Sequence, residues 1–254
     1  SELLQSINNH VDTLANETDA FVKSEHFKEY LDTMAKFWEY SYRNQLLIHF
    51  KMPDASKVAG FKAWKELGRN VKKGTKAIKI IAPSFKKNED DKEEMYFFPV
   101  NVFDISQTEG DELPHLDIAL QGSSHQELLD HMISLCEIKD IKVEFANLGV
   151  NGLYGYAQKG KIVISEKDSV NTQVNTIVHE LAHTLLHMNE EKLEDKFREI
   201  QAEGVSYVVC KYFGLEAISF AYLGLKKATS EDILANLEVI ARTSKEIIEG
   251  VESG

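Results

Sequence analysis

A chain of 254 residues with 43% hydrophobic content is long enough for two modest folded domains or one large one. The formal net charge of -12 weakens non-specific attraction to nucleic acid over the surface as a whole. No run approaches the roughly 18 apolar residues that cross a bilayer, so we expect no membrane partner. The chain begins without a signal-peptide pattern, and Cys136 and Cys210 lie far apart. We therefore expect free buried thiols and a cytoplasmic location.

One segment departs from the acidic composition. Residues 36–87 contain 13 Lys and Arg against three acidic residues, a net charge of +10, so the remainder carries -22. A local basic patch attracts phosphates within a Debye length of about 10 Å, even on an acidic protein. The segment therefore predicts one basic module in an acidic chain.

The N-terminal part predicts helices followed by a small sheet, because helical spacing of apolar residues gives way to short apolar runs. Gly68 stands where a helix C-cap prefers glycine. The charged insert at 86–94 is expected to be a solvated loop. Helices are expected at 3–15, 21–38, before Pro53 and at 60–67, with strands at 78–82 and 95–103. We assign residues 1–112 to this first domain.

Residues 113–124 lack periodicity and are rich in turn formers, which predicts a linker. The second domain, residues 125–254, is expected to mix helices and strands, so the predicted fold class is α+β. Two strands before a long helix are the order expected if a sheet edge lines a substrate cleft, where a peptide could add as a strand. Helices are expected at 125–136, from 170, at 197–210 and at 231–248, with strands at 141–145, 154–157 and 161–165.

The most informative motif is His179-Glu180-Leu181-Ala182-His183. Residues four apart share one face of an α-helix, so both imidazoles can reach one metal ion. Apolar neighbours at helical spacing, with no Gly or Pro from 170 to 197, support the helix. The bland alternative is a charged helix face, which the apolar surroundings disfavour. The motif predicts a Zn²⁺ site.

A catalytic zinc usually has three protein ligands and one open position. Glu203 is our candidate for the third, because a carboxylate among the apolar positions of the next helix is costly to bury without a cation. Glu199 lies one turn earlier, and Asp195 and His187 are also within reach. For His187 we prefer a surface or cleft position to a ligand role.

With His179, His183 and Glu203 as ligands, zinc would lower the pKa of a bound water to about 7. Glu180 would then be the catalytic general base. The predicted reaction is hydrolysis of a peptide or a similar amide in an unidentified protein substrate.

The basic segment also contains aromatic residues. Binding of single-stranded DNA without sequence preference requires both cations along the backbone and aromatic rings on which bases stack. Trp64 and Trp38 are candidates for base stacking, and a position in the hydrophobic core is an equally good explanation for each. Asn44 and Gln45 could contact bases. The candidate phosphate contacts are Arg43, Arg69, Lys72, Lys73 and Lys76.

Several motifs in order resemble one known family. Residues 42–48 (YRNQLLI), 58–64 (VAGFKAW), 68–74 (GRNVKKG) and 102–108 (VFDISQT) are similar to the N-terminal domain of ArdC-type antirestriction proteins and LtrC-like proteins of mobile elements. Residues 179–183 (HELAH) with 198–203 (REIQAE) resemble the metallopeptidase-like domain that follows in that family. The resemblance covers most of the chain.

The resemblance implies a single-stranded-DNA-binding domain, then a zincin-like domain with a His, His, Glu zinc site. It also implies protection of incoming DNA from restriction during conjugation, without establishing proteolysis. The rival hypothesis is a non-catalytic DNA-binding protein with a structural zinc. A third, a cytosolic metallopeptidase that regulates a repressor, leaves the N-terminal motifs unexplained. The sequence favours catalysis over a structural zinc. Structural zinc sites more often have four Cys or His ligands, whereas here a glutamate, Glu180, stands in the position of a general base.

Overall fold

The structure is a computed structural model that describes residues 2–87, 93–112, 125–150, 153–188, 193–217, 225 and 227–253, apart from the side chains at positions 86, 87 and 94. The predicted linker, and residues 88–92 of the charged insert, lie outside the described residues. The described chain divides into two compact units. The first holds residues 2–10 and 40–112, and the second holds residues 11–39 and those from 125 onward.

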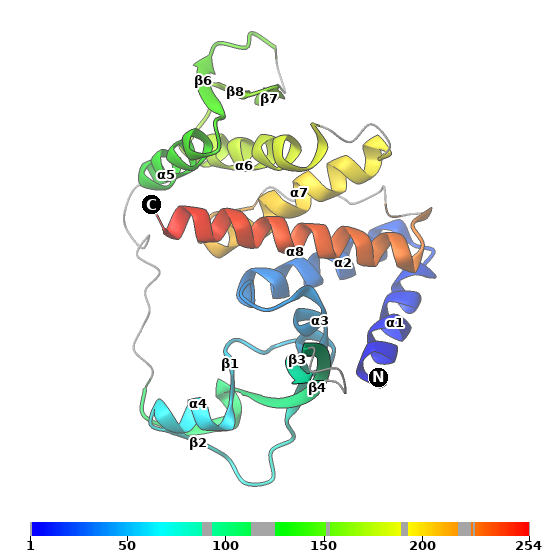
Figure 1. Cartoon of the computed structure of the whole chain (residues 1–254). Helices are drawn as coiled ribbons and strands as arrows, with labels where there is room; N and C mark the ends of the chain where they lie inside the picture. Colours follow the sequence, from blue (N-terminus) through cyan, green and yellow to red (C-terminus); the bar gives the residue numbers. More distant parts are fainter. Residues whose placement is uncertain are drawn as a thin grey trace. The chain divides into compact units, whose positions relative to one another are not determined.

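The first unit joins short helices to two small antiparallel sheets (Figure 1). Strands β3 and β4 form a long hairpin, paired from Ile78 with Val102 to Lys87 with Glu93. Strand β1 pairs with the other edge of β4, and β2 pairs with β5. Its elements are the start of α1 (Glu2–Ala15), α3 (Tyr42–Lys51), β1 (Val58–Gly60), α4 (Phe61–Glu66), β2 (Arg69–Val71), β3 (Ile78–Lys87), β4 (Glu93–Asp104), η1 (Ile105–Gln107) and β5 (Thr108–Gly110).

Helix α3 packs against β3 and covers part of its open edge. The Asn44 side chain donates to the Ile81 carbonyl at 2.8 Å and accepts from the Ile81 amide at 2.9 Å, as a neighbouring strand would. Helix α4 ends where the sequence predicted, because Gly68 adopts the left-handed conformation (φ 74°).

The described part of the second unit stacks a small sheet and five helices, besides the end of α1, in layers. Strand β8 lies between β6, which is parallel to it, and β7, which is antiparallel. The sheet lies on one side of α6, while α7 and α8 lie on the other (Figure 1). Its elements are the end of α1, α2 (Ala20–Lys36), α5 (His125–Ile138), β6 (Lys142–Ala146), β7 (Gly155–Gln158), β8 (Lys161–Ser165), α6 (Val170–His187), α7 (Asp195–Tyr212) and α8 (Ser230–Glu252).

Helices α6 and α7 form the centre of this unit. A capping hydrogen bond sets the start of α6, and a glycine sets how closely α7 packs against α8. The Ser169 hydroxyl accepts from the Thr172 amide and caps α6, as N-cap serines do. Gly204 lets α7 approach α8 closely, since a Cβ there would lie 2.5 Å from Ile240. The predicted α+β class is confirmed. Within the described residues, no helix has the length and apolar character needed to cross a membrane.

Candidate functional site

Helix α6 places the two predicted histidines on one face. Val174, Ile177 and Leu181 are fully buried and hold the opposite side of the helix in the core. The Nε2 atoms of His179 and His183 consequently lie 3.0 Å apart. Both rings are partly exposed, with side chains 25% and 19% accessible. A ligand at this face can reach both rings from solvent.

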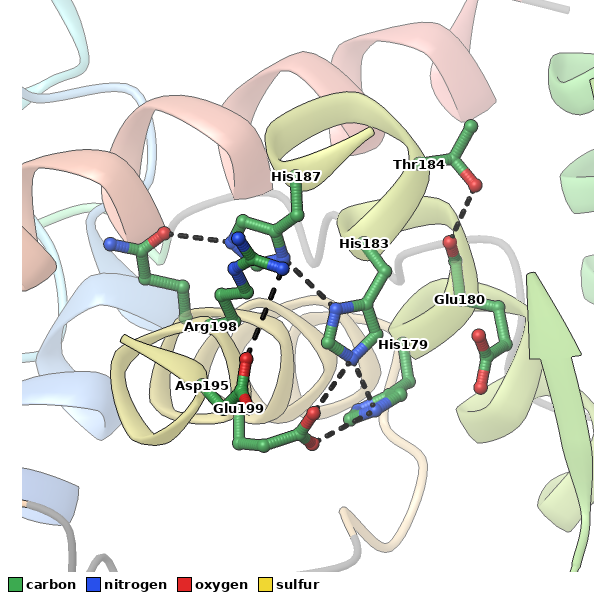
Figure 2. A network of polar contacts seen from close by, with 9 residues as sticks. His179, Glu180, His183, Thr184, His187, Asp195, Arg198 and Glu199 are labelled. Carbon is green, nitrogen blue, oxygen red and sulfur yellow. Dashed lines mark hydrogen bonds and ion pairs between the residues drawn. The ribbon is translucent and has the colours of Figure 1, made fainter. Parts of the chain in front are cut away.

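Helix α7 brings a carboxylate to the same point (Figure 2). Glu199 lies 3.7 Å from Nε2 of His179 and 3.4 Å from Nε2 of His183. Ligand atoms of these three side chains all lie within 4.8 Å of one another, which suits a single metal ion. Burial, with His183 and His187 nearby, lowers the pKa of His179 to about 4 despite Glu199. That imidazole is therefore neutral at pH 7, the form that binds metals.

Glu203, the predicted third ligand, lies one turn further along α7 and lines the same cavity. Burial, and then the charge of Glu199, raise the pKa of Glu203 to about 7. Among the described residues, its carboxyl has no hydrogen-bond or ion-pair partner. The pKa of Glu199 is lowered, mainly by a hydrogen bond from His183. Thus Glu199 contacts the histidines, while Glu203 is the more buried carboxyl.

Glu180 is partly buried on α6, next to His179, and accepts a hydrogen bond from the Ala157 amide of β7. Burial raises its pKa, although the nearby His183 opposes the shift. It lies outside the group of three possible ligands. A carboxylate beside a metal position, but free of the metal, can take a proton from water.

A cavity of about 450 Å³ opens between α6, α7 and β7, lined by His179, Glu180 and Glu203. Gly155 also lines it. A larger residue does not fit there, because a Cβ would lie only 2.6 Å from Thr176 Cγ2 and 2.8 Å from the Val163 carbonyl oxygen. Strand β7 is an edge strand of its sheet in the described part of the chain. Exposed Leu153 and Tyr154 give part of the cavity wall apolar character.

His187 lines a second pocket together with His183 and Glu199, in keeping with the predicted cleft position, but the residue is only 8% exposed and so does not lie on the open surface. Its Nδ1 atom lies 2.9 Å from Nδ1 of His183, and its Nε2 atom lies 3.0 Å from Oε1 of Gln201. The i, i+4 spacing from His183 was a visible signal for this contact, whereas its burial depends on packing between helices.

Four of the predicted DNA-contacting residues are engaged inside the first unit. Gln45 is 1% exposed, and its amide donates to the Tyr40 carbonyl at 3.0 Å. Trp64 is 2% exposed, and its indole donates to the Phe103 carbonyl at 2.8 Å. Asn44 is bonded to Ile81, as described above. The Arg69 guanidinium donates to Thr108 and to the carbonyls of Gly110 and Asp111, and so joins β2 to β5.

The other four predicted phosphate contacts are exposed. Arg43 lies over the Tyr42 ring, 5.4 Å from its centroid, and Lys72 donates to the Ser106 carbonyl. Lys73 and Lys76 are exposed in the turn that leads into β3. The sequence predicted the two strands of the hairpin but not which of their side chains are exposed. A set of aromatic and apolar side chains there is open to solvent. They are Phe85, Met95, Tyr96, Phe97 and Phe98.

Together, the fold and site define a mixed α+β protein with a metallopeptidase-like centre in its second unit. Residues 2–118 match the N-terminal domain of the anti-restriction factor ArdC, and residues 136–220 match the IrrE N-terminal-like domain of the M78 peptidase family. The chain therefore combines a domain similar to the ArdC N-terminal domain with an IrrE-like domain of the M78 type.

Solved structures share this fold, and one curated relative is similar in sequence over most of the chain. The metal-free and Mn(II)-bound crystal structures of antirestriction protein ArdC from plasmid R388 share the fold, with TM-scores of 0.57 and 0.54. Identity is 18% and 19%, over 84% of this chain and 86% and 89% of those chains. An uncharacterized Bacillus anthracis protein is 28% identical over 87% of this chain. The chain spans 46% of that relative's length.

Proposed function

We propose that this protein is an antirestriction factor of a mobile element whose second unit hydrolyses peptide bonds at a divalent metal and whose first unit binds single-stranded DNA. The observation that carries the hydrolytic part is the convergence of His179, His183 and an α7 carboxylate, with Glu180 beside them. Two imidazoles and one carboxylate are the donor set of many catalytic zinc sites.

The proposed ligands are His179, His183 and Glu203, with Zn²⁺ as the metal. The relevant difference between the two α7 carboxylates is burial. The Glu199 side chain is 55% exposed and can be solvated by water, whereas Glu203 is more enclosed. A buried carboxylate is stable when a cation compensates it. The Mn(II) in the R388 protein makes manganese the competing metal.

A divalent ion held there supplies Lewis acidity, which polarises a substrate carbonyl and acidifies water. Glu180 is the proposed general base that accepts the proton from the attacking water and passes it to the leaving amine. The Ala157 amide orients its carboxylate by donating to it. Because burial raises the pKa of Glu180, its carboxylate accepts a proton more readily than an exposed glutamate.

The proposed substrate is an extended peptide in an unidentified protein. The Ser165 amide donates to the Tyr154 carbonyl, so Tyr154 and Tyr156 face β8, and the backbone groups of Gly155 and the carbonyl of Ala157 point to the other side of β7. A peptide can add there as a strand, with main-chain hydrogen bonds supplying affinity. Leu153 and Tyr154 favour an apolar side chain next to the cleaved bond.

The test of hydrolysis compares the wild-type protein with Glu180→Gln, both loaded with metal, on a proteome-derived peptide library. Wild type should produce new peptide ends that are absent with Glu180→Gln, because the amide has similar volume but cannot act as base. Glu238→Gln, an exposed position on α8, is the matched control. Identical products from wild type and Glu180→Gln would favour the non-catalytic binding protein.

The DNA-binding part is supported by the composition of the first unit's surface. Lys73, Lys76 and Lys79 are exposed along the approach to β3. A cavity of about 340 Å³ combines Lys51 and Lys79 with the stacked rings of His10 and Phe50, whose centroids are 4.1 Å apart. Lysines attract phosphates, and the exposed aromatic rings of the hairpin offer stacking surfaces.

A further inference from the structure

A chain of polar side chains leads from His183 through His187 into the helical core of the second unit, and Figure 2 shows its first contact. His187, Gln201 and Asn236 are 8%, 7% and 3% exposed. Successive contacts along it measure 2.9 Å from His183 to His187, 3.0 Å from His187 to Gln201 and 3.0 Å from Gln201 to Asn236. Three helices, α6, α7 and α8, contribute to this chain.

The direction of every hydrogen bond in the chain follows from its last member. The Asn236 amide nitrogen lies 2.7 Å from the Asp232 carbonyl oxygen, which can only accept. The amide oxygen of Asn236 therefore faces Gln201 and accepts from the Gln201 amide nitrogen. This orientation leaves Oε1 of Gln201 toward His187, so Nε2 of His187 must carry the proton.

The same logic continues to the metal site. A neutral His187 protonated at Nε2 has a lone pair at Nδ1, and that atom faces Nδ1 of His183. His183 must then donate from Nδ1. Its Nε2 atom holds a lone pair for a metal when the ring carries no second proton, and it donates to Glu199, as in the metal-free contact, when that nitrogen is protonated as well. That atom points to Nε2 of His179 and to the Glu199 carboxylate, where the ligand atoms converge.

We propose that His187 is a positioning residue that holds the metal ligand His183 in the Nδ1-protonated tautomer and fixes its ring plane, with Gln201 and Asn236 fixing His187 in turn. The inference rests on the proposed metal site. The other tautomer of His183 would direct the Nε2–H group at the metal. It would also place the lone pair on Nδ1 of His183 against the lone pair on Nδ1 of His187. Outer partners of this kind orient metal-binding histidines and raise their basicity.

The first experiment reads the tautomer directly. Nitrogen-15 NMR of the imidazoles, on the full-length metal-free wild-type protein, should show His183 protonated at Nδ1. His187→Phe should give a mixture of tautomers, because phenylalanine fills the site without accepting a hydrogen bond. A wild-type His183 protonated at Nε2 and not at Nδ1 would overturn the proposal, whatever the variants do.

The second experiment measures affinity for Zn²⁺ by competition with a chelating dye. His187→Phe and Gln201→Leu should weaken binding by about 10- to 100-fold, the usual effect of losing an outer partner. His187→Asn should recover most of the affinity, because Oδ1 of asparagine stands near the position of Nδ1 and can accept. Thr243→Val, at a buried polar position of α8, is the matched control and should bind as wild type.

The outcomes separate this inference from the proposed function. If wild type binds no metal, the metal site itself fails. If wild type binds metal, while folded His187→Phe and Gln201→Leu keep its affinity, the positioning role is wrong and the metal site stands. If these variants unfold, the wild-type NMR result decides alone. Equal weakening in His187→Asn and His187→Phe would also contradict the role of the accepting atom.

Discussion

Two carboxylates one turn apart on α7 face the same cavity, and their charges interact. Glu199 raises the pKa of Glu203, in addition to the larger effect of burial. A metal ion that binds one of them also stabilises the ionised form of the other. Removing either residue therefore affects metal binding, but only the true ligand is needed for a bond to the metal.

We expect Glu203→Ala to lower zinc occupancy strongly and Glu199→Ala to lower it less, because the second change leaves all three proposed ligands in place. Elemental analysis of the purified full-length variants, after dialysis against a fixed zinc concentration, measures the difference. Full occupancy in Glu203→Ala together with loss in Glu199→Ala would transfer the ligand role to Glu199, the carboxylate that contacts both histidines.

At the scale of single residues, the sequence predicts which histidines lie together better than it predicts which polar residues are exposed for DNA. The spacing of His179 and His183 places both rings on one helix face wherever that helix packs. By contrast, Asn44 and Arg69 are polar residues whose partners are backbone groups distant in sequence. Residue type does not reveal those partners. Residue type does not decide either between core and stacking platform for Trp64, whose burial depends on the same packing.

At the scale of elements, Asn44 substitutes for a missing strand at the edge of β3. We expect Asn44→Ala to lower the free energy of unfolding by about 1 to 3 kcal/mol, because it leaves polar groups of Ile81 without their partner. Amide hydrogen exchange at Ile81 should accelerate as well. Urea denaturation and exchange mass spectrometry check both effects.

The matched control for this prediction is Asn70→Ala, at an exposed position of β2. It should change stability and exchange at Ile81 little. Unaltered protection of Ile81 in Asn44→Ala would show that the two hydrogen bonds do not hold the edge strand.

The long elements were predictable because they contain several turns or several alternations. Helices α6 and α8 follow apolar periodicity, and the cap at Ser169 fixes where α6 begins. Strands β1, β2 and β5 have only three residues each and were not predicted. Such short strands show no period. They form because distant partners meet, as Arg69 does with Gly110.

At the scale of the whole molecule, the charge is divided unevenly along the sequence. The basic segment 36–87 has a net charge of +10 in a chain of -12. Because electrostatic attraction between exposed charges is screened beyond about 10 Å, binding to DNA depends on the local surface and not on the total charge.

We expect the triple reversal Lys72→Glu, Lys73→Glu, Lys76→Glu to weaken single-stranded DNA binding at moderate salt. The salt slope of the logarithm of affinity should fall in magnitude by up to about 2, since each lost phosphate contact changes it by about 0.7. Fluorescence anisotropy over a salt series measures both. Reversal of Lys159, Lys167 and Lys227, exposed positions in the second unit, is the control with equal change in charge. Equal loss in both triples would remove the first unit's surface from the proposal.

The central claim is that His179, His183 and a carboxylate of α7 hold a single divalent metal ion, and metal stoichiometry tests it most directly. Mass spectrometry of the intact folded protein should show one zinc ion per chain in wild type and in Glu180→Gln, since Glu180 is not a ligand. His183→Ala should lose the ion, because one of three ligands is absent. A wild-type chain that stays metal-free in excess zinc, or a His183→Ala variant that retains the ion at wild-type affinity, would contradict the account.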